Sequence, residues 1–210
     1  MNIGFVLAGI SMVAAIACDW NTRKAAFYLF KPLTTAVVIA TALMLPAADA
    51  SYARLIEIAL LFCLLGDIAL MFHGDAAFIA GLSSFLVGHL LFAAAFLQGV
   101  PLLAPGHFAW IGALYGAVGL VILMPRVGKL RIPVAAYVAV LLAMWLGADA
   151  RLSQLGGAAA LRVLIGASIF IASDSFLAWD RFVKPLPLAQ PFILGTYYPA
   201  IMLIASSIAS

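Results

Sequence analysis

Charged residues are scarce in this chain, and their scarcity excludes most soluble folds. Only 9% of the 210 residues are Asp, Glu, Lys or Arg, whereas 67% are hydrophobic. A soluble domain carries about 25% charged residues, which cover its surface. The apolar runs are continuous and rich in Ala and Leu, so they lack the alternation of a transmembrane β-barrel. The composition therefore predicts an all-α integral membrane protein.

Motifs for metals, nucleotides and serine hydrolysis are also missing. The three histidines fall in segments that we expect at different depths, and the chain has no HExxH pair and no metal-binding cysteine pair. It has no GxSxG nucleophile motif and no glycine-rich phosphate loop. We therefore expect no metal and no cofactor. The net charge of +3 is typical of basic loops on one side of a membrane, so no nucleic-acid partner is predicted.

Charges, prolines and glycines divide the chain into eight apolar segments. A helix needs about 20 apolar residues to cross the hydrocarbon core of a bilayer. The predicted spans are residues 3–19, 32–46, 54–72, 78–98, 107–124, 132–148, 158–178 and 189–208. Because the connections are short, we expect one transmembrane domain over residues 1–210, folded as a compact bundle of about eight helices. The pattern makes no prediction of oligomeric state.

Lysines and arginines in the connections indicate the orientation of this bundle. The first, third, fifth and seventh loops hold eight of them, and the opposite side holds three. Since basic loops remain in the cytoplasm, we expect the odd-numbered loops there and both termini outside. For a bacterial inner membrane, that places the termini in the periplasm.

Two aspartates lie inside predicted spans, where an ionisable group is costly enough to indicate function. Asp67 is in "GDIALMF" of the third span and Asp174 in "SDSFLAW" of the seventh, 107 residues later. This spacing, about half the chain, is typical of a four-plus-four internal repeat. At 1.5 Å per residue, both carboxyls lie about 7 Å inside the cytoplasmic edge. Two adjacent carboxylates repel, so one is expected to keep a proton, as a general acid must. The simpler interpretation is that each aspartate accepts a hydrogen bond at a helix end.

Other polar residues fall in or near the same half of the membrane. His89 lies in the fourth span, six residues after Ser83, and Tyr197 and Tyr198 lie at a comparable depth in the eighth. Each of these also has a simpler role as a packing or hydrogen-bonding residue. Lys31, at the cytoplasmic end of the second span, is either an anchor for the positive side or a contact for an anionic phosphate.

Five segments, in order, carry a resemblance to a known family. They are "LFKPLTT" (29–35), "LLGDIALMF" (64–72), "FIAGLSSFLVGHLLF" (78–92), "IASDSFLAWDRF" (171–182) and "TYYPA" (196–200). Over nearly its whole length the chain resembles the YhhN family, also called the TMEM86 family of lysoplasmalogenases. The family motifs map onto Lys31, Asp67, Gly88, His89, Ser173, Asp174, Tyr197 and Tyr198. Where a Gln often follows the paired tyrosines in this pattern, the chain has Ile201 and Met202.

The resemblance implies an eight-helix membrane enzyme that acts on a lysophospholipid. Its reaction is hydrolysis of the vinyl ether bond of lysoplasmalogens, which yields a fatty aldehyde and glycerophosphoethanolamine or glycerophosphocholine. This chemistry needs a proton donor, a negative charge beside the oxocarbenium ion and an activated water. We expect Asp67 and Asp174 to be the acid/base pair, near the cytoplasmic side. His89, Ser83, Ser173 and the two tyrosines would orient groups, and Lys31 would contact the lipid phosphate.

Two functions from other classes remain open at this point. Buried aspartates also serve as relay groups in proton- or ion-coupled transporters, and a four-plus-four repeat suits that class. The same bundle also suits a protein that binds membrane lipids without turnover. Only the family resemblance places the hydrolase ahead of these alternatives.

Overall fold

The chain forms a bundle of helices in this computed structural model, which describes residues 2–101, 104 and 106–209. The eight α-helices of this part are α1 (Ile3–Trp20), α2 (Lys24–Leu43), α3 (Ala50–Ala69), α4 (Asp75–Phe96), α5 (Ala109–Leu123), α6 (Arg131–Leu155), α7 (Gly157–Phe182) and α8 (Ala189–Ser206). Short 3-10 helices, η1 (Gly128–Leu130) and η2 (Ser207–Ala209), precede α6 and follow α8. Each predicted span thus contains a helix, and the prediction of an all-α membrane bundle is confirmed.

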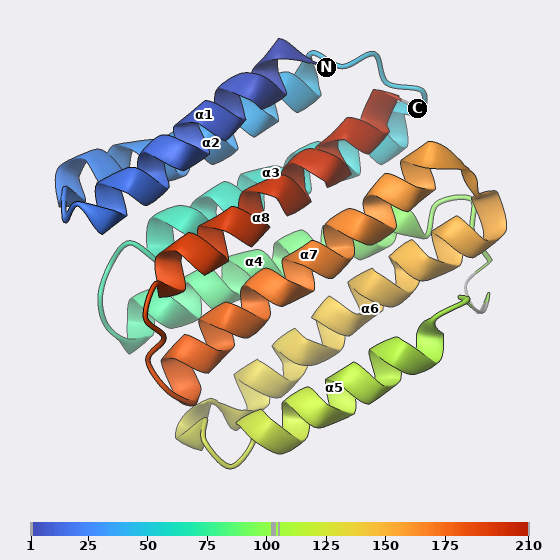
Figure 1. Cartoon of the computed structure of the whole chain (residues 1–210). Coiled ribbons are helices and arrows are strands. Elements are labelled where there is room, and N and C mark those ends of the chain that lie inside the picture. The colour runs from blue at the N-terminus through green and yellow to red at the C-terminus, as the bar shows by residue number, and fades with distance from the viewer. Residues whose placement is uncertain (1, 102–103, 105, 210) are drawn as a thin grey trace.

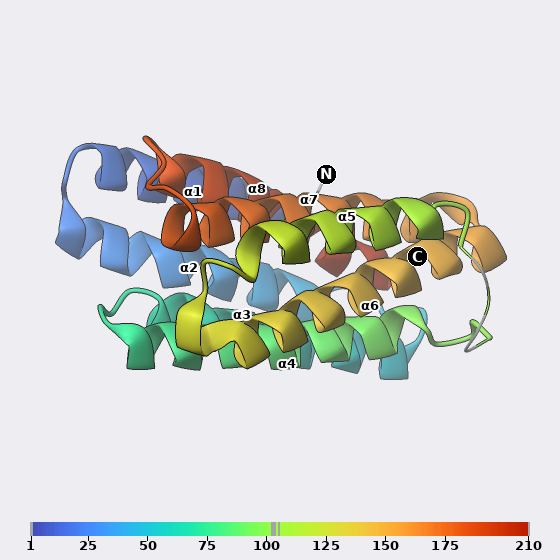
Figure 2. The ribbon, with the colours of Figure 1, turned by 90° about the horizontal axis from the view of Figure 1, so that it is seen from below.

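The helices lie side by side in two layers. In Figure 2, α1, α8, α7 and α5 form one layer, and α2, α3 and α4 form the other, while α6 crosses between the two at one side. Both termini lie at one end of the bundle, opposite the turns that join α1 to α2, α3 to α4 and α7 to α8 (Figure 1). The odd-numbered loops therefore share one end of the bundle.

Two helix boundaries differ clearly from their predicted spans: α6, predicted to end at residue 148, continues to Leu155, and α2 begins earlier than predicted. The second span was predicted to begin at Pro32, but α2 begins at Lys24 and continues through Pro32. Proline lacks an N–H and usually ends a helix, but packed neighbours in a membrane bundle tolerate it. The consequence is functional, because Lys31 becomes a buried residue inside a helix rather than the end of a loop.

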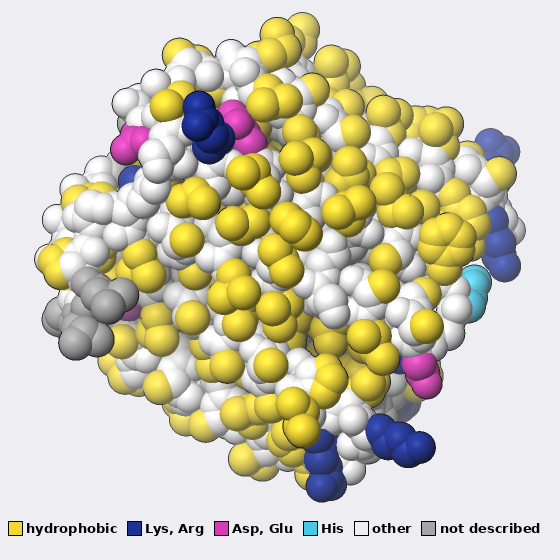
Figure 3. All heavy atoms as spheres, turned by 180° about the vertical axis from the view of Figure 1, so that it is seen from behind, with side chains coloured by type: hydrophobic (Ala, Val, Ile, Leu, Met, Phe, Trp, Pro, Cys, Tyr) yellow, Lys and Arg dark blue, Asp and Glu magenta, His cyan; other side chains and the backbone are white. Residues whose placement is uncertain are grey.

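The outer surface of the bundle is apolar between charged ends. Exposed residues on α5 recur every three or four positions, at Trp110, Leu114, Val118 and Val121. Figure 3 shows a broad hydrophobic belt, with charged side chains gathered toward the ends of the molecule. Six helical stretches of the described residues are long and apolar enough to cross a membrane. Of the other two helices, α3 carries three charged residues and α5 has only 15 residues.

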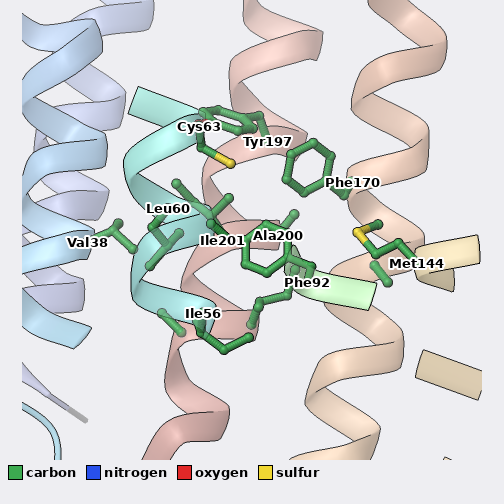
Figure 4. Close-up of a cluster of buried hydrophobic side chains, with 14 of the residues drawn as sticks. Val38, Ile56, Leu60, Cys63, Phe92, Met144, Phe170, Tyr197, Ala200 and Ile201 are labelled. Atoms are coloured by element: carbon green, nitrogen blue, oxygen red, sulfur yellow. The ribbon is translucent and has the colours of Figure 1, made fainter. Parts of the chain in front are cut away.

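Small residues let two pairs of helices approach closely, α3 with α4 and α7 with α8. A Cβ on Gly88 of α4 would lie 3.2 Å from the carbonyl oxygen of Ala59, and one on Gly166 of α7 would lie 3.0 Å from that of Ala200. Such contacts are the usual means of helix association in lipid. The core between the two pairs is filled by side chains that include Phe170 (Figure 4). Each pair contributes one of the two membrane aspartates.

Candidate active site

Asp67 is buried near the end of α3 and binds two hydroxyl groups from other helices. Its exposed fraction is 2%. Thr35 of α2 donates its hydroxyl to Oδ2 at 2.6 Å, and Tyr197 of α8 donates to the same oxygen at 2.8 Å. Three helices therefore meet at one carboxyl oxygen. Its partners are side chains of other helices, unlike those of a carboxyl that only ends its own helix.

Asp174 lies on α7, about two turns before that helix ends. Tyr137 of α6 donates its hydroxyl to Oδ2 at 2.8 Å. The Nε2 atom of His89, from α4, lies 3.8 Å from the same oxygen. Neither ring nitrogen of His89 has a hydrogen-bond partner in the described part of the chain, although the side chain is only 1% exposed. A buried imidazole without partners faces this carboxyl, and buried polar groups of proteins are rarely left so.

Aromatic rings separate the two carboxyls. The ring of Phe170 lies 5.5 Å from that of Tyr197 on one side and 4.6 Å from that of His89 on the other. Figure 4 shows Phe170 beside Tyr197. Across the residues that the structure covers, no hydrogen bond joins Asp67 to Asp174. Asp67 and Asp174 thus belong to two carboxyl clusters, with an aromatic wall formed by Tyr197, Phe170 and His89 between them. They are not a pair of hydrogen-bonded carboxyls that share one proton.

The two clusters occupy corresponding places in the order of helices. Asp67 of α3 meets side chains from α2 and α8, whereas Asp174 of α7 meets side chains from α6 and α4. In a four-plus-four repeat, α3 corresponds to α7, α2 to α6 and α8 to α4. Each partner helix of one aspartate thus has its counterpart at the other. This correspondence supports the predicted repeat more strongly than the short sequence similarity does.

An apolar cleft opens beside Asp174. It lies between α4, α5, α6 and α7, has a volume of about 80 Å³, and has Asp174 and Tyr137 in its wall. Apart from these two residues and Ser175 with Tyr115, its lining is made of hydrophobic side chains and glycines. A carboxyl in an otherwise apolar wall can act on a hydrophobic ligand without competition from other charges.

A second, polar cavity of about 180 Å³ lies at the end of the bundle that carries the odd-numbered loops. Lys31, His73, Asp180 and Arg181 are among its lining residues. Lys31 is 5% exposed and forms no salt bridge with any described residue. Phe78 and Leu177 line both cavities, so the polar cavity adjoins the apolar cleft. The arrangement suits an amphiphile with an anionic head and an apolar tail.

Three other residues predicted for the site do not reach either carboxyl. Ser173 donates its hydroxyl to the carbonyl oxygen of Ile193 at 3.0 Å and so joins α7 to α8. Tyr198 donates to the carbonyl oxygen of Lys31 at 2.7 Å, which joins α8 to α2. Ser83 lies on the exposed face of α4. The structure brings together Asp174, His89 and, through Phe170, the Asp67 cluster.

Sequence reasoning missed two residues of the site, Thr35 and Tyr137. Thr35 is four residues after Lys31, so the two share one face of a helix, and it belongs to the segment "LFKPLTT". That spacing was a usable signal. Tyr137 is a single tyrosine in the apolar run "IPVAAYVAV", outside all the segments that carry the resemblance. Only the packing of α6 on α7 shows its role. Among the described residues, no group of three or more His, Cys, Asp or Glu is placed to hold a metal ion.

The fold and the site define a polytopic α-helical membrane protein with two buried carboxyl clusters, one of them open to an apolar cleft. The sequence profile of the YhhN family matches residues 26–208. The chain belongs to the YhhN family, as its resemblance predicted.

Curated relatives extend this assignment. Lysoplasmalogenase TMEM86B from Homo sapiens is 39% identical over 74% of this chain and 64% of its own length. Lysoplasmalogenase TMEM86A from Bos taurus is 35% identical over 72% of this chain and 64% of its own length. Lysoplasmalogenase TMEM86B from Mus musculus is 31% identical over 97% of this chain and 84% of its own length. The chain thus spans 64% of the length of the first two of these relatives. No solved structure matches it.

Proposed function

We propose that this protein is an ether hydrolase that cleaves the vinyl ether bond of lysoplasmalogens. The products are a fatty aldehyde and glycerophosphoethanolamine or glycerophosphocholine. The observation that carries the proposal is the position of Asp174, in the wall of an apolar cleft that adjoins a cavity lined by Lys31 and Arg181. A lipid with one chain and a phosphate head matches this pair of cavities. The names of the curated relatives support the same reaction.

Asp174 is the proton donor in this proposal. It borders the cleft, whereas Asp67 lies behind the aromatic wall and reaches that wall through Tyr197. The proton moves from the Asp174 carboxyl to the β-carbon of the vinyl ether, and the π electrons form the new C–H bond. An oxygen lone pair then completes an oxocarbenium ion. The carboxylate left on Asp174 lies beside this cation and stabilises it.

Water completes the reaction without any further reagent. It adds to the oxocarbenium carbon and passes a proton to the Asp174 carboxylate, which restores the acid. The resulting hemiacetal then collapses to aldehyde and alcohol. His89 is placed to position this water, because its Nε2 lies 3.8 Å from Asp174 and has no other partner among the described residues. Asp67 holds Tyr197 in the aromatic wall and adds negative charge behind it.

Conversion of each aspartate to asparagine tests the proposal. Asp174→Asn removes the proton donor but keeps the shape of the side chain, so we expect kcat to fall by about 100-fold or more. Asp67→Asn weakens the hydrogen bonds of Thr35 and Tyr197, and we expect a smaller loss. Aldehyde release by purified protein in detergent is the measurement.

A matched control is Asp49→Asn. Asp49 caps α3 through the backbone N–H groups of Ser51 and Tyr52, and asparagine caps helices equally well. This variant should retain wild-type activity. If Asp174→Asn hydrolyses lysoplasmalogens as fast as Asp49→Asn does, the proposed role of Asp174 is wrong.

The proposed location is a bacterial inner membrane, with the polar cavity at the cytoplasmic face. The excess of Lys and Arg in the odd-numbered loops supports this orientation, and these loops share one end of the bundle with the cavity. Substrate would then enter from the cytoplasmic leaflet. Both termini would lie in the periplasm.

The transporter alternative lacks a structural feature that many members of that class share. Such proteins often bind their cargo at interrupted helices near the midplane. The helices α3 and α7, which carry the two aspartates, run from Ala50 to Ala69 and from Gly157 to Phe182 without a break.

A further inference from the structure

The polar cavity and the apolar cleft continue into a third cavity. Tyr115 of α5 lines both the cleft and a further apolar cavity of about 240 Å³. That third cavity is bordered by Trp145 and Ser168, on α6 and α7. Three cavities therefore adjoin one another: the first two share Phe78 and Leu177, and the cleft meets the third cavity at Tyr115, whose hydroxyl is hydrogen-bonded to that of Ser175 on α7.

The row of cavities runs along α7. Arg181 borders the polar cavity, Asp174 the cleft and Ser168 the third cavity. These residues span 13 positions of one helix, which corresponds to about 20 Å at 1.5 Å per residue. Only the first cavity is lined by basic side chains, Lys31 and Arg181, and Asp180 lies in the same wall. The path therefore leads from a charged end past the carboxyl of Asp174 into an apolar space.

We propose that this path between α5 and α7 is the binding site for the single hydrocarbon chain of a phospholipid. The phosphate occupies the polar cavity, and the chain extends past Asp174 toward Tyr115 and Trp145. The placement of the vinyl ether beside Asp174 rests on the proposed function. The choice of a single-chain anionic amphiphile rests on the charge at one end of the path and the apolar lining of the rest.

Two cations are available to the phosphate. Lys31 forms no salt bridge with a described residue; the carboxyls of Asp67 and Asp19 act on it from a longer distance, and its side chain borders the polar cavity. Arg181 is paired with Asp75 at 2.6 Å, but both side chains are well exposed. An exposed ion pair contributes little to stability, so Arg181 can exchange this partner for a phosphate.

The absence of a side chain at Gly119 keeps the cleft open on its α5 side. A Cβ at this position would meet no atom within 4 Å, although Gly119 lines the cleft. A larger side chain there would enter the cleft without displacing the backbone. Position 119 is therefore the place where the length of chain accepted by the protein can be altered.

The test is a graded series at this position, Gly119→Ala, Gly119→Val and Gly119→Leu. Alanine favours a helix over glycine, so the first member of the series is expected to fold. Val138→Trp fills the cleft from α6. Gly9→Leu on α1 is the matched control, because a Cβ there also meets no atom within 4 Å. The ligands are lysophosphatidylethanolamines with a saturated ether chain of 18 or 8 carbons, which cannot be hydrolysed by this mechanism.

We expect the affinity ratio of long to short chain, measured by native mass spectrometry, to fall stepwise along the series. In Gly119→Leu and Val138→Trp it should fall at least tenfold, and Gly9→Leu should match the wild type. The kcat/KM ratio for vinyl ether substrates of the same two lengths should fall in parallel.

If the ratio of the two affinities is unchanged in every folded variant at Gly119 and Val138, the proposed binding site for the hydrocarbon chain is wrong, whatever the hydrolytic activity of these variants. Failure of the wild-type protein to bind either ether would overturn it as well. If the binding ratio falls as expected while the wild type releases no aldehyde, the proposed reaction is wrong and the chain site stands.

Discussion

Adjacent tyrosines have separate roles in this protein. Consecutive residues of a helix point about 100° apart, so Tyr197 faces α3 and Tyr198 faces α2. Tyr197 donates to the Asp67 carboxyl, and Tyr198 donates to the backbone of Lys31. One hydroxyl therefore belongs to the site, and its neighbour joins two helices.

Because of this difference, we expect Tyr197→Phe to lower activity and Tyr198→Phe to lower stability, although each variant loses a single hydroxyl group. Tyr197→Phe removes a hydrogen bond to a carboxylate, worth about 1.5–3 kcal/mol, and we expect kcat to fall roughly tenfold, since 1.4 kcal/mol is a factor of ten. Tyr198→Phe removes a bond to a neutral carbonyl, so we expect about 1 kcal/mol lower stability and wild-type kcat. Steady-state kinetics and thermal melting in detergent measure the two effects. Equal losses of kcat in both variants would contradict this assignment.

The sequence predicts the charged residues of the site better than its hydroxyl groups. Asp67 and Asp174 are conspicuous because a carboxyl inside an apolar run is costly. Thr35 is marked only by its spacing of four residues from Lys31, and nothing in the local sequence of Tyr137 distinguishes it from a packing residue. Their role depends on which helices become neighbours, and this is a property of the assembled bundle.

At the scale of elements, α5 is the least firmly held helix of the bundle. In the described part of the chain its main packing partner is α6, and it forms one wall of the apolar cleft. Its N-terminal end is fixed by Asp149 of α6, a fully buried residue. The carboxyl accepts the backbone N–H of His107 at 3.1 Å and that of Phe108 at 2.8 Å. These bonds satisfy donors that the start of a helix leaves free.

We expect Asp149→Ala to loosen α5 selectively. The change leaves two backbone N–H groups without an acceptor, at a cost of about 1–3 kcal/mol for each group that stays buried. Hydrogen exchange measured by mass spectrometry should rise in α5, while the closely packed pair of α3 and α4 remains protected. Exchange that rises equally in α3 and α5, or in neither, would show that Asp149 does not act on α5 alone.

The sequence predicts where helices occur better than it predicts which helices pack against each other. Apolar length alone predicts a helix within every span, but the second span was misplaced at Pro32 because proline usually ends helices in water. The correspondence between α3–α4 and α7–α8 is faint in the sequence, where only "GDIALMF" and "SDSFLAW" are similar. It becomes evident once the partners of each aspartate are known.

On the scale of the whole molecule, the apolar belt and the charged ends are those of a membrane protein, and the basic residues of the loops predict its orientation. Both termini lie at the end opposite the odd-numbered loops. We expect alkaline phosphatase fused to the C-terminus to be active in a bacterial host, and green fluorescent protein fused there to be dark. A bright fluorescent fusion with an inactive phosphatase fusion would reverse the proposed orientation.

The cavities are the part of the molecule that the sequence did not predict. Their walls consist of ordinary apolar residues and glycines from helices that are distant in the chain. Composition gives the lipid-facing surface and the buried carboxyls, but the space beside Asp174 arises from the way α5 lies across α6 and α7. The proposed substrate geometry therefore depends on the assembled structure.

The central claim is that a carboxylic acid of the protein delivers a proton to the β-carbon of a vinyl ether. The most direct test is to incubate the purified wild-type protein with a lysoplasmalogen in D₂O and to trap the aldehyde at once by reduction. The account predicts a fatty alcohol with one deuterium at the carbon next to the former carbonyl, and loss of this product in Asp174→Asn. An unlabelled product, or intact lysoplasmalogen after prolonged incubation, would contradict it.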